Sequence, residues 1–197
     1  LIAPVLAGTA VAVAGHGFAP APAVLALIVA LALQVGVNYA NDYSDGIRGT
    51  DDERVGPLRL VGSGAASPRA VKIAAFASFG VAALAGLIVV MMTAQWWLLG
   101  VGVACVLAAW FYTGGQRPYG YAGLGEVFVF VFFGLVATVG TTYVQLLATP
   151  AASWSAGVFA GALASAVLVT NNLRDRVGDA TSGKRTLAVR LGDRGTR

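Results

Sequence analysis

Residues 127–173 read VFVFVFFGLVATVGTTYVQLLATPAASWSAGVFAGALASAVLVTNNL, a run of 47 residues without a single Lys, Arg, Asp or Glu. A helix needs roughly 20 predominantly apolar residues to cross the hydrocarbon core of a bilayer. The run is therefore long enough for two crossings. Residues 149–153 (TPAAS) interrupt it near the middle, and proline favours a break between helices there. The pattern predicts a membrane-embedded helical hairpin with spans at 124–147 and 154–173.

Two further stretches have the same character. Residues 1–41 and 73–116 contain no charged side chain, and they are 41 and 44 residues long. Proline-rich and tryptophan-rich turns divide them, with the sequences HGFAPAP and TAQWW. The additional spans are expected at 1–15, 23–41, 70–91 and 96–113. The predicted fold is all-α: one multi-pass transmembrane helical bundle over residues 1–197, with about six transmembrane helices arranged as three hairpins.

The composition agrees with this fold class and excludes others. Of 197 residues, 57% are hydrophobic and 11% are charged, whereas a soluble domain has roughly 25% charged residues. These proportions exclude most soluble enzymes and disordered chains. The single cysteine, Cys105, excludes a disulfide framework and is expected to be a small packing residue within a span. The 26 glycines suit close packing of helices in lipid.

The charged residues are expected to lie on one face of the membrane. All 22 of them fall within residues 42–72, 117–126 and 174–197, which connect or follow the hairpins. Because an excess of Lys and Arg marks the cytoplasmic side, we predict a cell-membrane protein whose charged face is cytoplasmic. The net charge of +4 then reflects membrane topology. The expected partners include the lipid bilayer and do not include nucleic acid.

The N-terminal segment has two possible interpretations. The chain begins at Leu1 rather than Met, and no basic segment precedes the first span, so we expect it to be clipped there. Residues 12–14 (AVA) resemble a signal-peptidase site, but a signal peptide requires a positively charged start that this segment lacks. A transmembrane span is the favoured interpretation.

A first acidic cluster ends the second predicted span. Asn38, Asn41, Asp42 and Asp45 are spaced by three and four residues, which places them on one face of a helix. Ligands that offer only oxygen suit Mg²⁺, which keeps several waters and accepts substrate phosphates in its remaining positions. The cluster therefore predicts a magnesium site at one end of the helix.

A second cluster of the same kind ends the last predicted span. Asn171, Asp175 and Asp179 are spaced by four residues on one helix face. Facing the first cluster, they would form a cavity lined by carboxylates at the membrane surface. Ionisable groups so close to hydrocarbon are expensive and usually functional. The alternative is that these residues only terminate helices and form a solvated surface.

Basic residues accompany both acidic clusters. Arg48, Arg54 and Arg59 follow the first, while Arg174, Lys184 and Arg185 flank the second. Carboxylates beside guanidinium and ammonium groups suit a metal-bridged diphosphate, since the cations can bind its outer oxygens. A lipid that carries the diphosphate would explain a site that opens into the membrane. Positive-inside topology is the alternative explanation for each cation taken singly.

Aromatic side chains fill the middle charged segment. Trp110, Tyr112, Tyr119 and Tyr121 lie in or beside a glycine-rich loop near the proposed site. Their rings could stabilise a carbocation or stack on an aromatic acceptor. For Tyr119 and Tyr121, an interfacial aromatic belt is at least as good an explanation.

Together these motifs resemble a known family. Asn38-x-x-Asn41-Asp42-x-x-Asp45 and Asn171-Asn172-x-x-Asp175-x-x-x-Asp179 resemble the paired Asp-rich motifs of the UbiA superfamily of intramembrane prenyltransferases. Residues 41–46 (NDYSDG), 56–59 (GPLR) and 183–192 (GKRTLAVRLG) are similar to its menaquinone branch, the 1,4-dihydroxy-2-naphthoate polyprenyltransferases. The resemblance runs along nearly the whole chain.

The resemblance implies a reaction and a set of site residues. Mg²⁺ would neutralise the diphosphate of a polyprenyl donor, an allylic cation would form, and the naphthoate ring would attack it and lose its carboxyl group, giving a demethylmenaquinone. The implied metal ligands and catalytic residues are Asp42, Asp45, Asp175 and Asp179. The implied substrate-binding residues are Asn38, Asn41, Arg48, Tyr112, Asn171, Lys184 and Arg185. Asp51 could be a ligand or a loop residue, and a supporting role is favoured.

The resemblance also defines the alternatives. Family members have nine transmembrane helices and this chain supplies about six, so an incomplete domain is expected. A 4-hydroxybenzoate or homogentisate acceptor would place the protein in another branch. A CDP-alcohol phosphotransferase is rejected, because the downstream elements of that motif are absent at the required spacing. A membrane transporter, the remaining alternative, would more often place its carboxylates near the middle of the bilayer.

Overall fold

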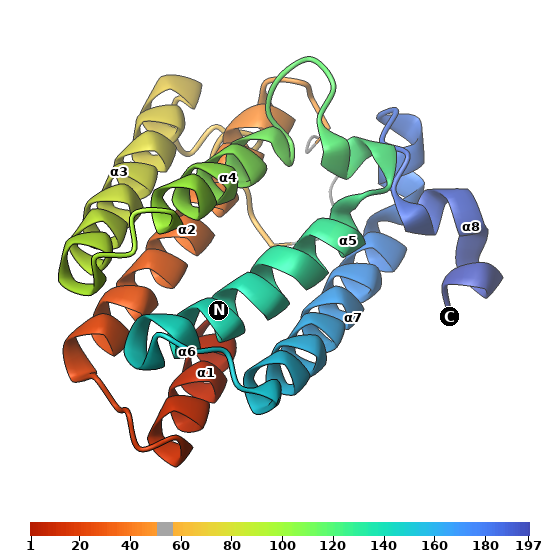
Figure 1. The fold of residues 1–197 in the computed structure, drawn as a ribbon. Coiled ribbons are helices and arrows are strands. Elements are labelled where there is room, and N and C mark those ends of the chain that lie inside the picture. The colour runs from red at the N-terminus through yellow and green to blue at the C-terminus, as the bar shows by residue number, and fades with distance from the viewer. Residues whose placement is uncertain (51–56) are drawn as a thin grey trace.

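The computed structural model describes residues 1–50 and 57–197, and these residues form helices and connecting turns without a β-strand (Figure 1). Asp51 and Arg54 lie outside the described residues. The helices are α1 (Ile2–Ala14), α2 (Pro20–Gly46), α3 (Pro68–Thr93), α4 (Leu98–Phe111), α5 (Gly125–Val129), α6 (Ala137–Leu146), α7 (Ala151–Thr181) and α8 (Leu187–Thr196). A 3₁₀ turn covers Tyr119–Ala122, and a π-helical segment covers Phe130–Val136 between α5 and α6. The predicted all-α class is confirmed.

Four of these elements are long and apolar enough to cross a membrane. They are α2, α3, α7 and the continuous helix Gly125–Leu146, which α5, the π-helical segment and α6 form together. Two shorter apolar helices, α1 and α4, have 13 and 14 residues. Together these helices correspond to the six predicted spans and make the chain a multi-pass membrane protein.

The two helices that carry the acidic motifs extend beyond their predicted apolar spans. The pattern predicts spans over 23–41 and 154–173, whereas α2 and α7 end at Gly46 and Thr181. The polar motif residues therefore continue each helix for one to two turns past the apolar segment. Because helical geometry persists through them, residues three and four apart keep a common face.

Small residues allow the helices to approach closely. A Cβ atom on Gly134 would lie 2.4 Å from the Cα atom of Gly161, so the π-helical segment and α7 meet backbone to backbone. A Cβ atom on Gly36 would lie 2.5 Å from the ring of Phe79, where α2 packs against α3. The first contact joins the π-helical segment to α7, and the second joins α2 to α3. The site lies between these two pairs.

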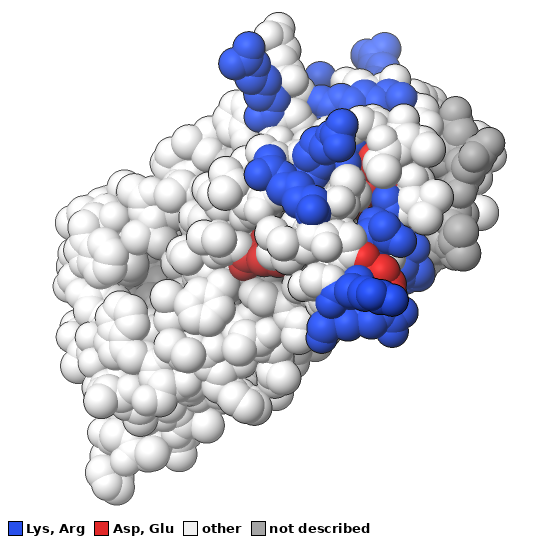
Figure 2. Space-filling model, turned by 90° about the vertical axis from the view of Figure 1, so that its right-hand side faces the viewer, with Lys and Arg blue, Asp and Glu red and all other residues white. Residues whose placement is uncertain are grey.

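The surface separates into a charged end and an apolar remainder. Figure 2 shows Lys and Arg gathered at one end of the molecule, with a broad area beyond them free of charged residues on that face. Large apolar side chains along the spans are exposed, among them Leu84, Phe159 and Leu163. Exposed apolar side chains on long helices are expected where lipid is the solvent.

Candidate active site

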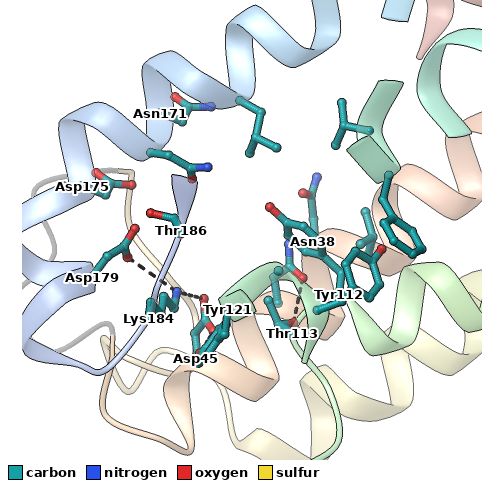
Figure 3. A pocket seen from close by; sticks show the side chains of 18 of the residues that line it. Asn38, Asp45, Tyr112, Thr113, Tyr121, Asn171, Asp175, Asp179, Lys184 and Thr186 are labelled. Atoms are coloured by element: carbon teal, nitrogen blue, oxygen red, sulfur yellow. Dashed lines mark hydrogen bonds and ion pairs between the residues drawn. The ribbon is translucent and has the colours of Figure 1, made fainter. Parts of the chain in front are cut away.

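A cavity of about 940 Å³ lies between α2, α4, the 3₁₀ turn, α7 and residues 182–186 (Figure 3). Its polar lining includes Asn38, Asn41, Asp45, Tyr112, Thr113, Tyr121, Asn171, Asp175, Asp179 and Lys184. Its apolar lining includes Leu33, Val37, Ala109, Phe128, Phe132, Phe133, Val167 and Leu168. The cavity is therefore amphipathic and can hold a molecule with a charged head and an apolar tail.

Asp45 connects the two acidic motifs. Its side chain is almost fully buried, with the residue 3% exposed. The Tyr121 hydroxyl donates to Oδ1 over 2.6 Å, and the Lys184 ammonium donates to Oδ2 over 2.8 Å. Nζ of Lys184 also lies 3.9 Å from Oδ1 of Asp179 (Figure 3). A single ammonium thus joins the motif on α2 to the motif on α7.

The backbone after α7 places Lys184 between the carboxylates. α7 ends at Thr181, and Gly183 adopts a φ of +80°, a conformation that glycine tolerates best. The Lys184 amide then donates to the carbonyl of Asp179 over 2.8 Å. This turn folds the segment back across the end of α7, so Lys184 and Thr186 line the cavity.

Asp42 lies one turn before Asp45 but does not line the cavity. Its two carboxylate oxygens accept hydrogen bonds from the backbone amides of Leu60 and Val61, over 2.8 and 2.9 Å. The residue is 5% exposed. Both oxygens are engaged in holding the segment that follows α2, and Arg59, the residue before Leu60, lines the cavity. The structure therefore separates Asp42 from the other three predicted metal ligands.

Arg48, also expected at the substrate, is engaged with the loop after α4. Its guanidinium donates to the carbonyl oxygens of Thr113 and Gly115 and lies 5.3 Å from the centre of the Tyr121 ring. The Thr113 hydroxyl donates to Oδ1 of Asn41 over 2.8 Å. Arg48 and Asn41 thus fix this loop to the end of α2, and Asn41 also lines the cavity.

Three tyrosines from the loop region, Tyr112, Tyr119 and Tyr121, line the cavity. Burial, and then the charges of Glu126, Asp45 and Asp179, raise the pKa of Tyr112. Burial, and then the Asp45 carboxylate, raise the pKa of Tyr121. The Tyr119 hydroxyl donates to the carbonyl of Ala108 over 2.7 Å, and burial raises its pKa as well. These phenols remain protonated near neutral pH, and the Tyr119 and Tyr121 hydroxyls donate hydrogen bonds.

The second motif lies along the opposite wall of the cavity. Asn171, Asp175 and Asp179 all line it, as the four-residue spacing predicts (Figure 3). The Arg174 guanidinium makes two hydrogen bonds to the carboxylate of Asp175, over 2.6 and 2.8 Å. The spacing on α7 therefore presents two carboxylates and an amide to the same space as Asp45.

Arg185 is the remaining predicted substrate-binding residue. It does not line the cavity, and its backbone makes hydrogen bonds to neighbouring segments. Its amide donates to the Tyr121 carbonyl over 2.9 Å, and its own carbonyl accepts from Nε of Arg190 over 3.2 Å. Lys184 and Thr186 on either side line the cavity, whereas Arg185 does not.

Sequence reasoning missed several contacts of the site. No role was predicted for Thr113. For Tyr121, a role in the site and a place in an interfacial aromatic belt both remained possible. Sequence reasoning also missed Asn172, which lines the cavity and donates to Oε1 of Glu126 over 2.9 Å. Asn172 is part of the second acidic motif, so its position next to Asn171 could have marked it as a candidate site residue. The partners of Thr113 and Tyr121 lie 72 and 76 residues away in the chain, and no local pattern points to them.

The donor set of the cavity suits Mg²⁺ bound together with a substrate. Within residues 1–50 and 57–197, no three His, Cys, Asp or Glu side chains come close enough to hold one metal ion. Mg²⁺ is usually bound by one or two carboxylates plus substrate phosphates and water, so it does not require such a cage. Asp45, Asp175 and Asp179 offer oxygen alone, on two facing walls of the cavity.

Comparisons with known proteins place the chain among similar sequences. Residues 1–197 match the family described as the UbiA prenyltransferase family. The chain is 58% identical over 196 residues to the 1,4-dihydroxy-2-naphthoate octaprenyltransferase of Mycobacterium tuberculosis, covering 100% of this chain and 67% of that protein. Identity to the protein of the same name is 56% over 196 residues in Mycobacterium leprae and 40% over 197 residues in Escherichia coli.

The chain is shorter than these relatives. The match covers 100% of this chain and 66% of the Mycobacterium leprae protein, and 97% of this chain and 64% of the Escherichia coli protein. The chain therefore spans about two thirds of their length. No solved structure matches it significantly.

Proposed function

The chain belongs to the UbiA prenyltransferase family, and from this premise we propose that the protein transfers a polyprenyl group from polyprenyl diphosphate to 1,4-dihydroxy-2-naphthoate. The carboxyl group of the acceptor is lost, and the product is a demethylmenaquinone. The support for this acceptor is that the similar proteins from Mycobacterium tuberculosis, Mycobacterium leprae and Escherichia coli carry the name 1,4-dihydroxy-2-naphthoate octaprenyltransferase.

The observation that carries the proposal is the amphipathic cavity. Carboxylates and a lysine line one end of it, and aromatic and aliphatic side chains line the rest. A polyprenyl diphosphate has the same division between a charged head and an apolar chain. The electrostatic and apolar demands of the donor are thus met by one continuous space.

The diphosphate is expected to bind between α2 and α7. One or two carboxylates among Asp45, Asp175 and Asp179 would hold Mg²⁺ together with the diphosphate, and Asn38 and Asn171 would lie beside it as amide ligands or donors. Mg²⁺ supplies charge neutralisation, which makes diphosphate a better leaving group. Lys184 and Arg59 line the same region and would bind the outer phosphate oxygens. Asp42 and Arg48 contribute by holding the surrounding segments in place.

The wall of aromatic side chains suits the acceptor and the allylic cation. The ring of Tyr119 stacks on Phe128 at 3.9 Å between centroids, and Phe128 stacks on Phe132 at 5.9 Å. The π faces of such rings stabilise a nearby cation. Apolar walls keep water from trapping it before the naphthoate ring attacks. Tyr112 lines the cavity, and its protonated hydroxyl would donate a hydrogen bond to donor or acceptor.

We place the protein in the cell membrane with this cavity opening to the cytoplasmic side. The support is that all 13 Lys and Arg residues fall within residues 42–72, 117–126 and 174–197, which connect or follow the predicted hairpins. A water-soluble aromatic acid and the membrane-embedded donor would then meet at the interface.

The test is a transfer assay with membranes that contain the protein. They are incubated with Mg²⁺, a polyprenyl diphosphate and, in separate reactions, 1,4-dihydroxy-2-naphthoate, 4-hydroxybenzoate and homogentisate. We expect a decarboxylated, prenylated product from the first acid only, and no product when a chelator removes Mg²⁺. Prenylation of another acid in preference would refute the acceptor. The absence of any product, or full activity in the Asp175→Ala variant, would refute the proposal as a whole.

A further inference from the structure

Tyr121 makes more contacts with the charged groups of the site than any interfacial role requires. Its hydroxyl donates to Oδ1 of Asp45 over 2.6 Å. Its ring lies 4.9 Å from Nζ of Lys184 and 5.3 Å from Cζ of Arg48, measured to the centroid. Its carbonyl accepts from the Arg185 amide over 2.9 Å. One side chain and its backbone therefore join α2, the loop after α4 and the segment after α7.

The two carboxylate oxygens of Asp45 have different partners. Oδ1 is held by Tyr121, while Oδ2 is held by Lys184, whose ammonium also lies 3.9 Å from Asp179. When a cation and a diphosphate enter the cavity, Lys184 can shift to the phosphate. Oδ2 is then the oxygen that becomes free, because Oδ1 stays bonded to the phenol.

We propose that Tyr121 is a positioning residue: its hydroxyl orients Asp45 so that Oδ2 faces the cavity, and its ring holds the Lys184 ammonium between the two acidic motifs. The inference rests on the proposed function for its substrate. Partners in the outer sphere of a site commonly fix the orientation of the groups that bind a metal. The ring supplies an additional attraction for a partly desolvated ammonium.

Tyr119 offers a matched control from the same 3₁₀ turn. It also lines the cavity, and its hydroxyl also makes one hydrogen bond, of 2.7 Å, but the acceptor is the backbone carbonyl of Ala108. Tyr119→Phe and Tyr121→Phe therefore remove equivalent groups from the same loop. Only the second removes a donor from a carboxylate.

The first measurement is the Mg²⁺ concentration that gives half-maximal prenyl transfer. Removal of a hydrogen bond to a buried charged group should raise this concentration about tenfold in Tyr121→Phe. Tyr119→Phe should keep the wild-type Mg²⁺ dependence, whatever its effect on the rate. Wild-type dependence in Tyr121→Phe, or an equal shift in both variants, would overturn the assignment.

The second measurement needs neither metal nor substrate. The chain has two lysines, Lys72, which is exposed, and Lys184, whose side chain is 13% exposed. An amine-reactive reagent is applied to the protein, and the acylation rates of the two lysines are compared by peptide mass spectrometry. Loss of the ring in Tyr121→Leu should raise the Lys184-to-Lys72 ratio about two- to fivefold, whereas Tyr121→Phe and Tyr119→Phe should leave it near the wild-type value.

The two measurements separate the inference from the proposed function. If the wild-type protein transfers no prenyl group, the proposed function fails, and the lysine ratio alone decides whether Tyr121 holds Lys184. A ratio that is unchanged in Tyr121→Leu overturns the inference even if the enzyme is active.

Discussion

Replacement of Asp42 by asparagine tests whether this residue binds metal or holds the chain. Its carboxylate accepts the amides of Leu60 and Val61 over 2.8 and 2.9 Å and is excluded from the cavity lining. An asparagine side chain offers one oxygen acceptor in place of two, and it carries no charge. The substitution therefore removes at least one charge-assisted hydrogen bond and weakens the other.

The two hydrogen bonds to Asp42 determine how far the substitution should weaken the attachment of the segment around Leu60. A hydrogen bond to a charged group contributes about 1.5–3 kcal/mol, so the segment around Leu60 should detach more easily by about 2–4 kcal/mol. Arg59 precedes this anchor and lines the cavity. Its displacement should raise the KM for polyprenyl diphosphate by about tenfold, because one phosphate contact is weakened. The Mg²⁺ dependence should remain close to that of the wild type.

Hydrogen exchange combined with kinetics provides the assay. In Asp42→Asn the amides of Leu60 and Val61 should exchange faster, while Asp45→Asn should leave them protected and shift the Mg²⁺ dependence instead. Asp193→Asn, which alters a half-exposed carboxylate on α8 paired with Arg197, serves as the control for a change of charge alone. Unchanged exchange at Leu60 and Val61, together with a Mg²⁺ shift as large as that of Asp45→Asn, would show that Asp42 is a metal ligand and refute the reasoning.

Three further predictions concern Lys184, the packing of α7 at Gly161, and the hydroxyl of Tyr121. Lys184→Met, which keeps an unbranched side chain one atom shorter and removes its charge, should raise the KM for polyprenyl diphosphate about ten- to a hundredfold; an unchanged KM would exclude a phosphate contact. Gly161→Ala should lower the free energy of unfolding by about 1–3 kcal/mol, because its Cβ would lie 2.8 Å from the carbonyl oxygen of Phe130. Gly100→Ala, where an added Cβ has no neighbour within 4 Å, is the control in the same denaturation experiment, and equal stability of the two variants would contradict the packing. Because burial and the Asp45 charge raise the pKa of Tyr121, its contribution to stability is present below about pH 10 and is lost as the pH rises through its folded-state pKa. Tyrosinate absorbance should therefore develop at higher pH in the folded wild type than in the unfolded chain, and Tyr121→Phe should reduce the difference; coincident titration curves would contradict it.

The apolar helices could be predicted from the sequence because their cause is local. Whether a segment crosses a bilayer depends on its own length and polarity, so charge-free runs of 41, 44 and 47 residues were sufficient to predict helical hairpins. The spacing of Asn171, Asp175 and Asp179 likewise predicted one face, because helix periodicity is a property of neighbouring residues. The structure places all three on the cavity.

The ends of the helices were less well predicted than the spans themselves. Hydropathy stops at the polar motif residues, whereas α2 and α7 continue to Gly46 and Thr181. The backbone hydrogen bonds of a helix do not depend on the polarity of its side chains, so a helix can continue past the point where the side chains become polar. The motif residues are consequently held by rigid helices rather than by loops.

The sequence by itself determined the all-helical membrane fold, the two acidic motifs and their meeting at one end of the bundle. Only the tertiary structure decided which carboxylate faces the cavity. Asp42 and Asp45 are alike in type and in helix face, but Asp42 meets backbone amides 18 and 19 residues later, whereas Asp45 meets Tyr121 and Lys184, 76 and 139 residues later. A hydrogen bond depends on where its two atoms lie in space, and chain separations of this size leave that position to the packing of the helices.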